Sequence, residues 1–163
     1  MYNWPSFFVT FRSEALWRDG PYQLHQRLLN WAASVGYVPA KPETMTRVDF
    51  CFDYDLPCMD FNEDHFLTLS SKDPQHREDG NIQTFTFGRS DVVLRVYDKV
   101  AEIAQQSGKV WLFFLWDQHE NVWRIEWQVR KTVLRRFGIH TFQQLGDQAK
   151  PLLAYLAHEH DTL

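Results

Sequence analysis

The chain has 163 residues and a formal net charge of −4, from 17 Lys and Arg against 21 Asp and Glu. This balance excludes a protein that coats nucleic acid by uniform positive charge. Hydrophobic residues make up 44% of the sequence and aromatic residues 16%, which supplies a core and excludes an intrinsically disordered chain. The length predicts a single domain over residues 1–163.

The sequence also indicates the cellular compartment. No apolar run approaches the ~20 residues that a membrane span needs. The N-terminus lacks the basic start and the apolar stretch of a signal peptide. The two cysteines, Cys51 and Cys58, fit a reducing cytosol better than a disulfide scaffold, although one bridge between them stays open. We therefore expect a cytoplasmic protein with no membrane partner.

The first half of the chain alternates between apolar and polar segments. Residues 6–12 (SFFVTFR) are rich in Phe and Val and predict a strand. Pro21 follows Gly20 and predicts a helix start, and Gly36 is placed to end that helix. Residues 46–55 predict a second strand. The polar segment 60–81 predicts mostly loop.

The second half predicts a hairpin followed by mixed elements. Residues 82–87 and 92–98 predict two strands joined by a Gly-containing turn. Residues 101–106 predict a helix, whereas the apolar run 109–116 fits a buried helix or a strand equally well. Residues 121–130 predict the last strand.

The C-terminal part predicts helices. Residues 132–137 predict a short helix that ends at Gly138. Thr141 and Gln144 form a capping-box pattern that opens a final helix, which Pro151 is expected to kink or restart. The sum is an α+β fold, an antiparallel sheet of about five strands with helices packed on one face.

Three of the predicted strands carry polar residues at every second position. Side chains alternate across a strand, so each strand has one polar face. These faces hold Arg47, Asp49, Cys51 and Asp53 on the first strand, Arg95, Tyr97 and Lys99 on the second, and Arg124, Glu126, Gln128 and Arg130 on the third. One interpretation is a solvated face with ordinary cross-strand ion pairs. Asp is a poor strand former, which favours a functional use instead.

The chemistry of this set suits a phosphodiester. Asp49, Asp53 and Glu126 are oxygen donors of the kind that hold Mg²⁺ or Mn²⁺. Tyr97 is a candidate nucleophile, and a metal ion or the neighbouring Lys99 would favour its phenolate. Together they describe transesterification through a phosphotyrosine, which suits nicking and rejoining of DNA.

Cations on and after these strands are candidate DNA contacts. Arginine and lysine bind phosphate oxygens. The candidates are Arg47, Arg95, Arg124, Arg130 and Lys131. For the cluster after residue 129, a solvated helix face is the alternative.

Three segments carry a family resemblance. RVDFCFD (47–53), TFTFGRSDVVLRVYDKVAE (84–102) and WRIEWQVR (123–130) resemble, in order, motifs of the Rep_trans family of replication initiation factors. The resemblance covers residues 46–137, followed by a helical part over 138–163. It implies a fold related to the HUH endonucleases and a relaxase-like endonuclease activity that depends on Mg²⁺ or Mn²⁺, with Tyr97 as the nucleophile.

The resemblance also implies a biological setting. Such a protein initiates rolling-circle replication or the transfer of a plasmid, phage or integrative element. Its expected partner is single-stranded DNA or an origin hairpin. The chain has no room for a helicase of its own, so a host helicase is a further candidate partner.

Two alternatives remain at this point. The chain could be a non-catalytic DNA-binding or regulatory module derived from this fold, or a protein that interacts with a host component. The enzyme hypothesis requires the Tyr97 hydroxyl and at least two of the three carboxylates to converge on one open pocket. A Tyr97 buried against Trp or Phe side chains would exclude it.

Overall fold

The computed structural model describes residues 7–57, 76–78, 81–88 and 90–158. The chain forms two compact units, Met1–Glu43 and Thr44–Leu163, and each is described separately. The motif-bearing segment 46–137 lies in the second unit. In the described part of the chain, no helix combines the length and apolarity of a membrane span.

The first unit contains two helices, α1 (Ser13–Asp19) and α2 (Pro21–Ser34). The predicted start of α2 at Pro21 is confirmed. Proline suits the first helical position because the N–H that it lacks would have no intrahelical partner there. The strand predicted over residues 6–12 is wrong, because residues 7–12 have no regular secondary structure. Phe7 instead packs its ring edge-on against Tyr37, at a centroid distance of 4.8 Å. An apolar run forms a strand only where a partner strand pairs with its backbone.

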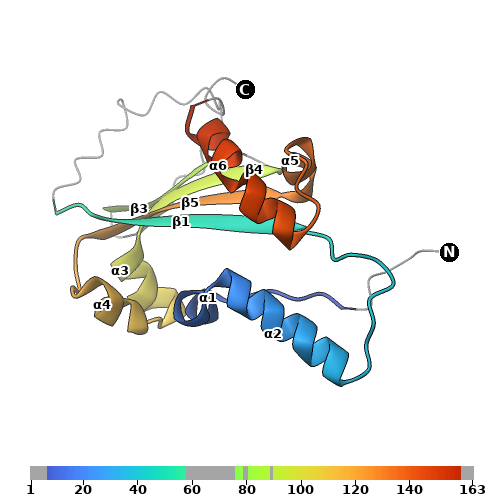
Figure 1. Ribbon diagram of the computed structural model, residues 1–163. Helices are drawn as coiled ribbons and strands as arrows, with labels where there is room; N and C mark the ends of the chain where they lie inside the picture. The colour runs from blue at the N-terminus through green and yellow to red at the C-terminus, as the bar shows by residue number, and fades with distance from the viewer. Residues whose placement is uncertain (1–6, 58–75, 79–80, 89, 159–163) are drawn as a thin grey trace. The chain divides into compact units, whose positions relative to one another are not determined.

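The second unit is built on an antiparallel sheet in the order β1-β5-β4-β3-β2. Four strands have seven to nine residues, and a three-residue strand lies at one edge. In chain order they are β1 (Arg47–Asp55), β2 (His76–Glu78), β3 (Asn81–Phe87), β4 (Val92–Asp98) and β5 (Val122–Arg130). Figure 1 shows β1, β5 and β4 running side by side.

Four of the predicted strands are therefore confirmed to within one residue at each end, together with the β3–β4 hairpin. The hairpin turn uses positive φ angles at Gly88 (80°) and Ser90 (62°). The short strand β2 falls in the segment predicted mostly as loop. The rest of that segment, apart from the start of β3, lies outside the described residues.

One face of the sheet is apolar and covered by α5 (Lys131–Arg136) and α6 (Phe142–His158) (Figure 1). Val129 of β5 packs there with Leu134, Ile139, Leu152 and Leu156, all no more than 1% exposed. Burying five such side chains provides ~1.5–3 kcal/mol for each. This packing fixes which face of each strand points away from the core.

The predicted capping box of α6 is confirmed. The Gln144 side chain accepts a hydrogen bond from the Thr141 backbone at 3.1 Å, and the Gln144 backbone donates to the Thr141 hydroxyl at 3.4 Å. Of the two effects expected at Pro151, a kink or a restart, the restart does not occur, since α6 continues through that residue. Leu152 and Leu156 lie in the core beyond the proline, and their burial offsets the lost backbone hydrogen bond.

The opposite face of the sheet meets a second group of helices. These are α3 (Lys99–Glu102), a π-helical turn η2 (Ile103–Ser107) and α4 (Trp111–Trp116). The prediction of helices on one face is therefore wrong. β4 passes directly into α3 because Asp98 caps the helix, accepting a hydrogen bond from the Ala101 backbone at 3.0 Å. This junction carries the chain onto the polar face.

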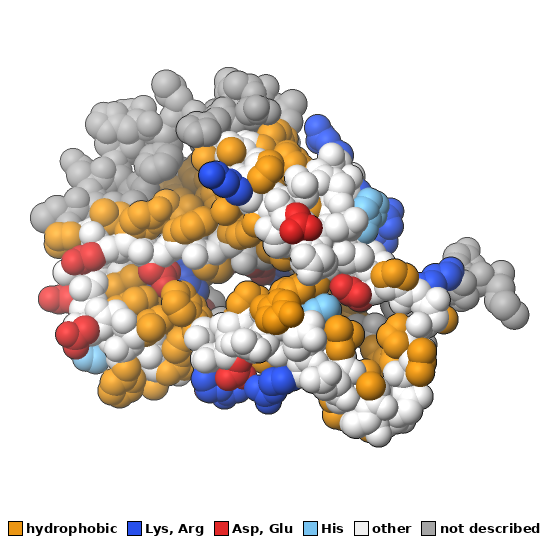
Figure 2. Space-filling model, in the orientation of Figure 1, with side chains coloured by type: hydrophobic (Ala, Val, Ile, Leu, Met, Phe, Trp, Pro, Cys, Tyr) orange, Lys and Arg blue, Asp and Glu red, His pale blue; other side chains and the backbone are white. Residues whose placement is uncertain are grey.

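Within the ambiguous run 109–116, residues Trp111–Trp116 form the helix α4. Leu112 is 1% exposed, while Phe114 on the outer side is 85% exposed. Figure 2 shows hydrophobic side chains over this helix. A buried side and an exposed side on consecutive turns are typical of an amphipathic helix. A strand would instead need a neighbouring strand to pair with its backbone.

Candidate functional site

The polar faces of β1, β5 and β4 coincide, as the alternation predicts. Cross-strand register places Cys51 and Arg95 on either side of Glu126, and Asp53 and Tyr97 on either side of Arg124. Residues directly opposite in an antiparallel pair share a face. We call this surface the polar face.

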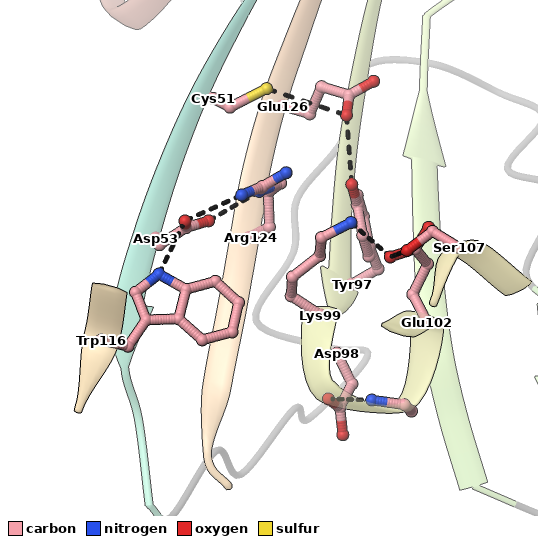
Figure 3. Close-up of polar contacts among 11 residues, drawn as sticks. Cys51, Asp53, Tyr97, Asp98, Lys99, Glu102, Ser107, Trp116, Arg124 and Glu126 are labelled. Carbon is pink, nitrogen blue, oxygen red and sulfur yellow. Dashed lines mark hydrogen bonds and ion pairs between the residues drawn. The ribbon is translucent and has the colours of Figure 1, made fainter. Parts of the chain in front are cut away.

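One end of the polar face is a closed ion-pair cluster. Arg124 donates two hydrogen bonds to Asp53, at 2.6 and 2.8 Å, and the Trp116 indole donates a third at 3.1 Å (Figure 3). The side chain of Arg124 is 5% exposed and that of Asp53 is 12% exposed. Burial by itself disfavours the guanidinium charge, but the bonds to Asp53 hold the Arg124 pKa above its usual value. Arg124, which the sequence predicts to contact DNA phosphate, binds the Asp53 carboxylate in this structure, and its contact with phosphate stays a prediction.

Asp49 is engaged in a second pair, with Arg47 two residues before it. The guanidinium donates at 2.7 and 2.5 Å in a bidentate arrangement. This pair is more exposed, with 50% of the Arg47 side chain accessible. Each of these two carboxylates is thus matched by its own arginine.

The three predicted metal ligands do not come together. Among the described residues, no group of three His, Cys, Asp or Glu side chains could hold a metal ion. Asp49 and Asp53 bind arginines, and Glu126 binds Arg95 and Tyr97. Strand alternation places the carboxylates on one face, but the register sets a cation beside each. These residues do not fit a three-carboxylate site.

Tyr97 and Glu126 line an open pocket of about 370 Å³. The Tyr97 hydroxyl donates to Glu126 Oε2 at 3.1 Å, and Arg95 donates to Oε1 at 2.9 Å. Figure 3 shows the hydroxyl pointing at the carboxylate. Arg95 also lines the pocket, so one predicted phosphate-binding residue is next to the candidate nucleophile. One of the three predicted carboxylates shares the pocket with Tyr97, where the enzyme hypothesis asks for two.

The Tyr97 phenol is held in its protonated form. Burial raises its pKa well above the usual value, and the Glu126 charge and hydrogen bond raise it further. The neighbouring Arg124 charge acts in the opposite direction and favours the phenolate, but burial and Glu126 outweigh it. Glu126 is nevertheless placed to take the proton when the oxygen attacks an electrophile.

Lys99 lies beside the Tyr97 ring (Figure 3). The amine is 5.6 Å from the ring centroid and forms an ion pair with Glu102, which also accepts a hydrogen bond from Ser107 at 3.0 Å. Lys99 is 1% exposed, and burial lowers its pKa. Lys99 therefore packs against the Tyr97 ring and connects it to Glu102.

Cys51 is a neighbour of the site that the sequence alone does not assign. Its thiol lies 3.9 Å from Glu126 Oε2. Desolvation of the thiol raises the pKa of Cys51 to about 11, and the Glu126 charge contributes to the shift. Its place on the polar face follows from alternation, but its contact with Glu126 requires the β1–β5 register.

The remaining predicted phosphate contacts lie at the far end of β5. Arg130 is exposed, and Lys131 begins α5. Arg130 is four residues from Glu126, the β5 residue that lines the pocket, or about 13 Å along an extended strand. The structure therefore separates these two cations from the Tyr97 pocket.

Comparisons of the chain with protein-family models, with curated proteins and with solved structures each gave no match.

Proposed function

We propose that this protein nicks and rejoins DNA by transesterification through Tyr97. The observation that carries the proposal is the Tyr97 hydroxyl, hydrogen-bonded to Glu126 at 3.1 Å in an open pocket that Arg95 also lines. A hydroxyl and a carboxylate at this distance form a nucleophile and its general base.

The reaction follows from these groups. The Tyr97 oxygen attacks a backbone phosphorus while its proton passes to Glu126, and a tyrosine–phosphorus ester forms. The bond from phosphorus to one sugar oxygen breaks, and that oxygen takes the proton from Glu126. Rejoining reverses each step. The ester conserves the energy of the broken bond, so no further reactant is needed.

Arg95 supports the same step. Its guanidinium binds Glu126 and faces the pocket, so it is placed to contact a phosphate oxygen and counter the developing charge. Dependence on Mg²⁺ or Mn²⁺ remains a prediction from the family resemblance, and we assign no step to a metal. Initiation of rolling-circle replication or of mobile-element transfer is proposed on the same resemblance.

A second candidate is a DNA-binding or regulatory module without turnover. The observation that favours it is the pairing of Asp53 with Arg124 and of Asp49 with Arg47, which leaves one of the three predicted carboxylates in the pocket. In this case the polar face has a structural role.

A covalent trap separates the two candidates. The protein is incubated with a randomised pool of single-stranded DNA, with Mn²⁺ or with EDTA, and run on a denaturing gel. We expect a nuclease-sensitive shifted band that Tyr97→Phe abolishes. Tyr54→Phe is the matched control, because Tyr54 is 46% exposed and lies on the other face of β1. A band that survives Tyr97→Phe would contradict the proposal, and DNA binding without any band would favour the second candidate.

A further inference from the structure

One wall of the Tyr97 pocket is a π-helical turn with two adjacent glutamines. Gln105 and Gln106 belong to η2 (Ile103–Ser107), and both line the pocket. The turn closes with the Gly108 backbone donating to the Ile103 carbonyl at 3.0 Å, and Gly108 adopts a φ of 61°. π-Helical turns are rare and occur often at functional sites.

This turn is fixed from beneath by a small polar network. Glu102 precedes η2, and its Oε2 receives both the buried Lys99 amine and the Ser107 hydroxyl. Lys99 in turn lies against the Tyr97 ring. The network therefore ties both ends of η2 to the element that carries the nucleophile, so the two amides are held at a set position relative to Tyr97.

The pocket is rich in hydrogen-bond acceptors. Besides the two glutamines, its lining includes Thr84, Arg95 and three acidic residues, Asp98, Glu102 and Glu126. Glu102 pairs with the buried Lys99 and Glu126 with Arg95, so three carboxylates meet two cations. Anionic walls disfavour a second phosphate deep in the pocket. They favour a neutral group that presents N–H donors. Side-chain amides also pair with such a group, since each offers one acceptor and two donors.

We propose that this pocket holds the nucleobase next to the scissile phosphate, and that it selects bases with an exocyclic amino group. This inference rests on the proposed function of Tyr97. The exocyclic amino groups of adenine, cytosine and guanine each donate up to two hydrogen bonds to carboxylate or amide oxygens, whereas thymine offers only its single ring N3–H. Gln105 and Gln106 are the specificity-determining residues. The volume of about 370 Å³ lies within the range of pockets that hold small ligands.

The test uses a Tyr97→Phe protein, which cannot form the covalent ester, so that base binding is measured without nicking. The probes are dAMP, dCMP, dGMP and dTMP, titrated while the side-chain amide signals of Gln105 and Gln106 are followed by NMR. We expect the three amino-bearing nucleotides to shift these signals and to bind at least about fivefold more tightly than dTMP. The double substitution Gln105→Ala and Gln106→Ala should remove this preference. Gln143→Ala on the exposed start of α6 is the matched control and should leave it intact.

Equal binding of dTMP would overturn the inference, as would a preference that survives loss of both glutamines. Absence of binding by all four nucleotides would also overturn it, even if the covalent trap succeeds. The opposite result, selective binding without a covalent band, would preserve the base pocket and remove the nicking function. Failures of the two proposals are therefore distinguishable.

Discussion

Two cross-strand carboxylate–arginine pairs on the polar face differ in what covers them. Asp53 and Arg124 meet at 2.6 Å with side chains 12% and 5% exposed, beneath the indole of Trp116. Glu126 and Arg95 meet at 2.9 Å with side chains 16% and 33% exposed, at the edge of a pocket. Both pairs join a carboxylate to an arginine directly opposite on the neighbouring antiparallel strand. The difference between them is the cover that Trp116 of α4 gives to the first pair, and our proposal gives the more open pair the chemical role.

The largest expected effect is on the open pair. Glu126→Gln removes the proposed base while keeping the size of the side chain, so the rate of covalent-ester formation should fall by about 10²- to 10⁴-fold. Asp49→Asn is the control, because Asp49 lies on the same face with its own arginine, and its rate should stay within a few-fold of the parent. The readout is the time course of the shifted band. An equal fall in the rate of ester formation in both variants would contradict a specific role of Glu126 as the base.

The buried pair of Asp53 and Arg124 should contribute more to the free energy of unfolding than the exposed pair of Asp49 and Arg47. Arg124→Ala leaves the Asp53 carboxylate buried without its cation, and we expect the free energy of unfolding to drop by about 3–5 kcal/mol. Arg47→Ala breaks a more exposed pair and should cost less than about 1 kcal/mol. Urea denaturation of both variants measures the difference. A smaller loss for Arg124→Ala than for Arg47→Ala would show that cover does not separate the pairs.

Lys99 connects the pocket to its supporting turn. Lys99→Met keeps the aliphatic stem but leaves Glu102 without its cation, so the free energy of unfolding should fall by about 1–3 kcal/mol. Lys109→Met, on the loop before α4, is the matched control and should change it by less than about 0.5 kcal/mol. Circular dichroism during urea denaturation gives both values. Matching losses would argue against a supporting role for Lys99.

The smallest effect concerns Cys51 beside the open pair. Because the pKa of Cys51 is raised to about 11, its thiol stays protonated at neutral pH and its alkylation rate should rise through a midpoint near that value. The measurement is the iodoacetamide rate against pH in a Cys58→Ser background. Glu126→Gln removes a neighbouring negative charge and should lower the midpoint. A midpoint near 9 in the parent would contradict the placement of Cys51 against Glu126.

The sequence predicts the sheet better than its surroundings. Alternation identifies β1, β4 and β5 and the shared polar face, because period-2 patterning is local and survives folding. It fails at residues 7–12, which have no regular secondary structure and where Phe7 packs against the Tyr37 ring.

The site divides in the same way. Strand alternation predicts that Tyr97 and Glu126 share a face, and their side chains are in contact, although the sequence points to Glu126 as a metal ligand. The ion pair between Asp53 and Arg124 depends on the cross-strand register. The position of Gln105 and Gln106 in the pocket wall depends on a π-helical turn. Both are set by tertiary packing, which residue spacing does not encode.

The most direct measurement of the central claim is the position of the covalent ester. After reaction with single-stranded DNA, nuclease and protease digestion leave a nucleotide on one peptide, which tandem mass spectrometry locates. The account predicts a phosphotyrosine adduct on Tyr97. An adduct on Tyr54 or on any other residue would contradict it.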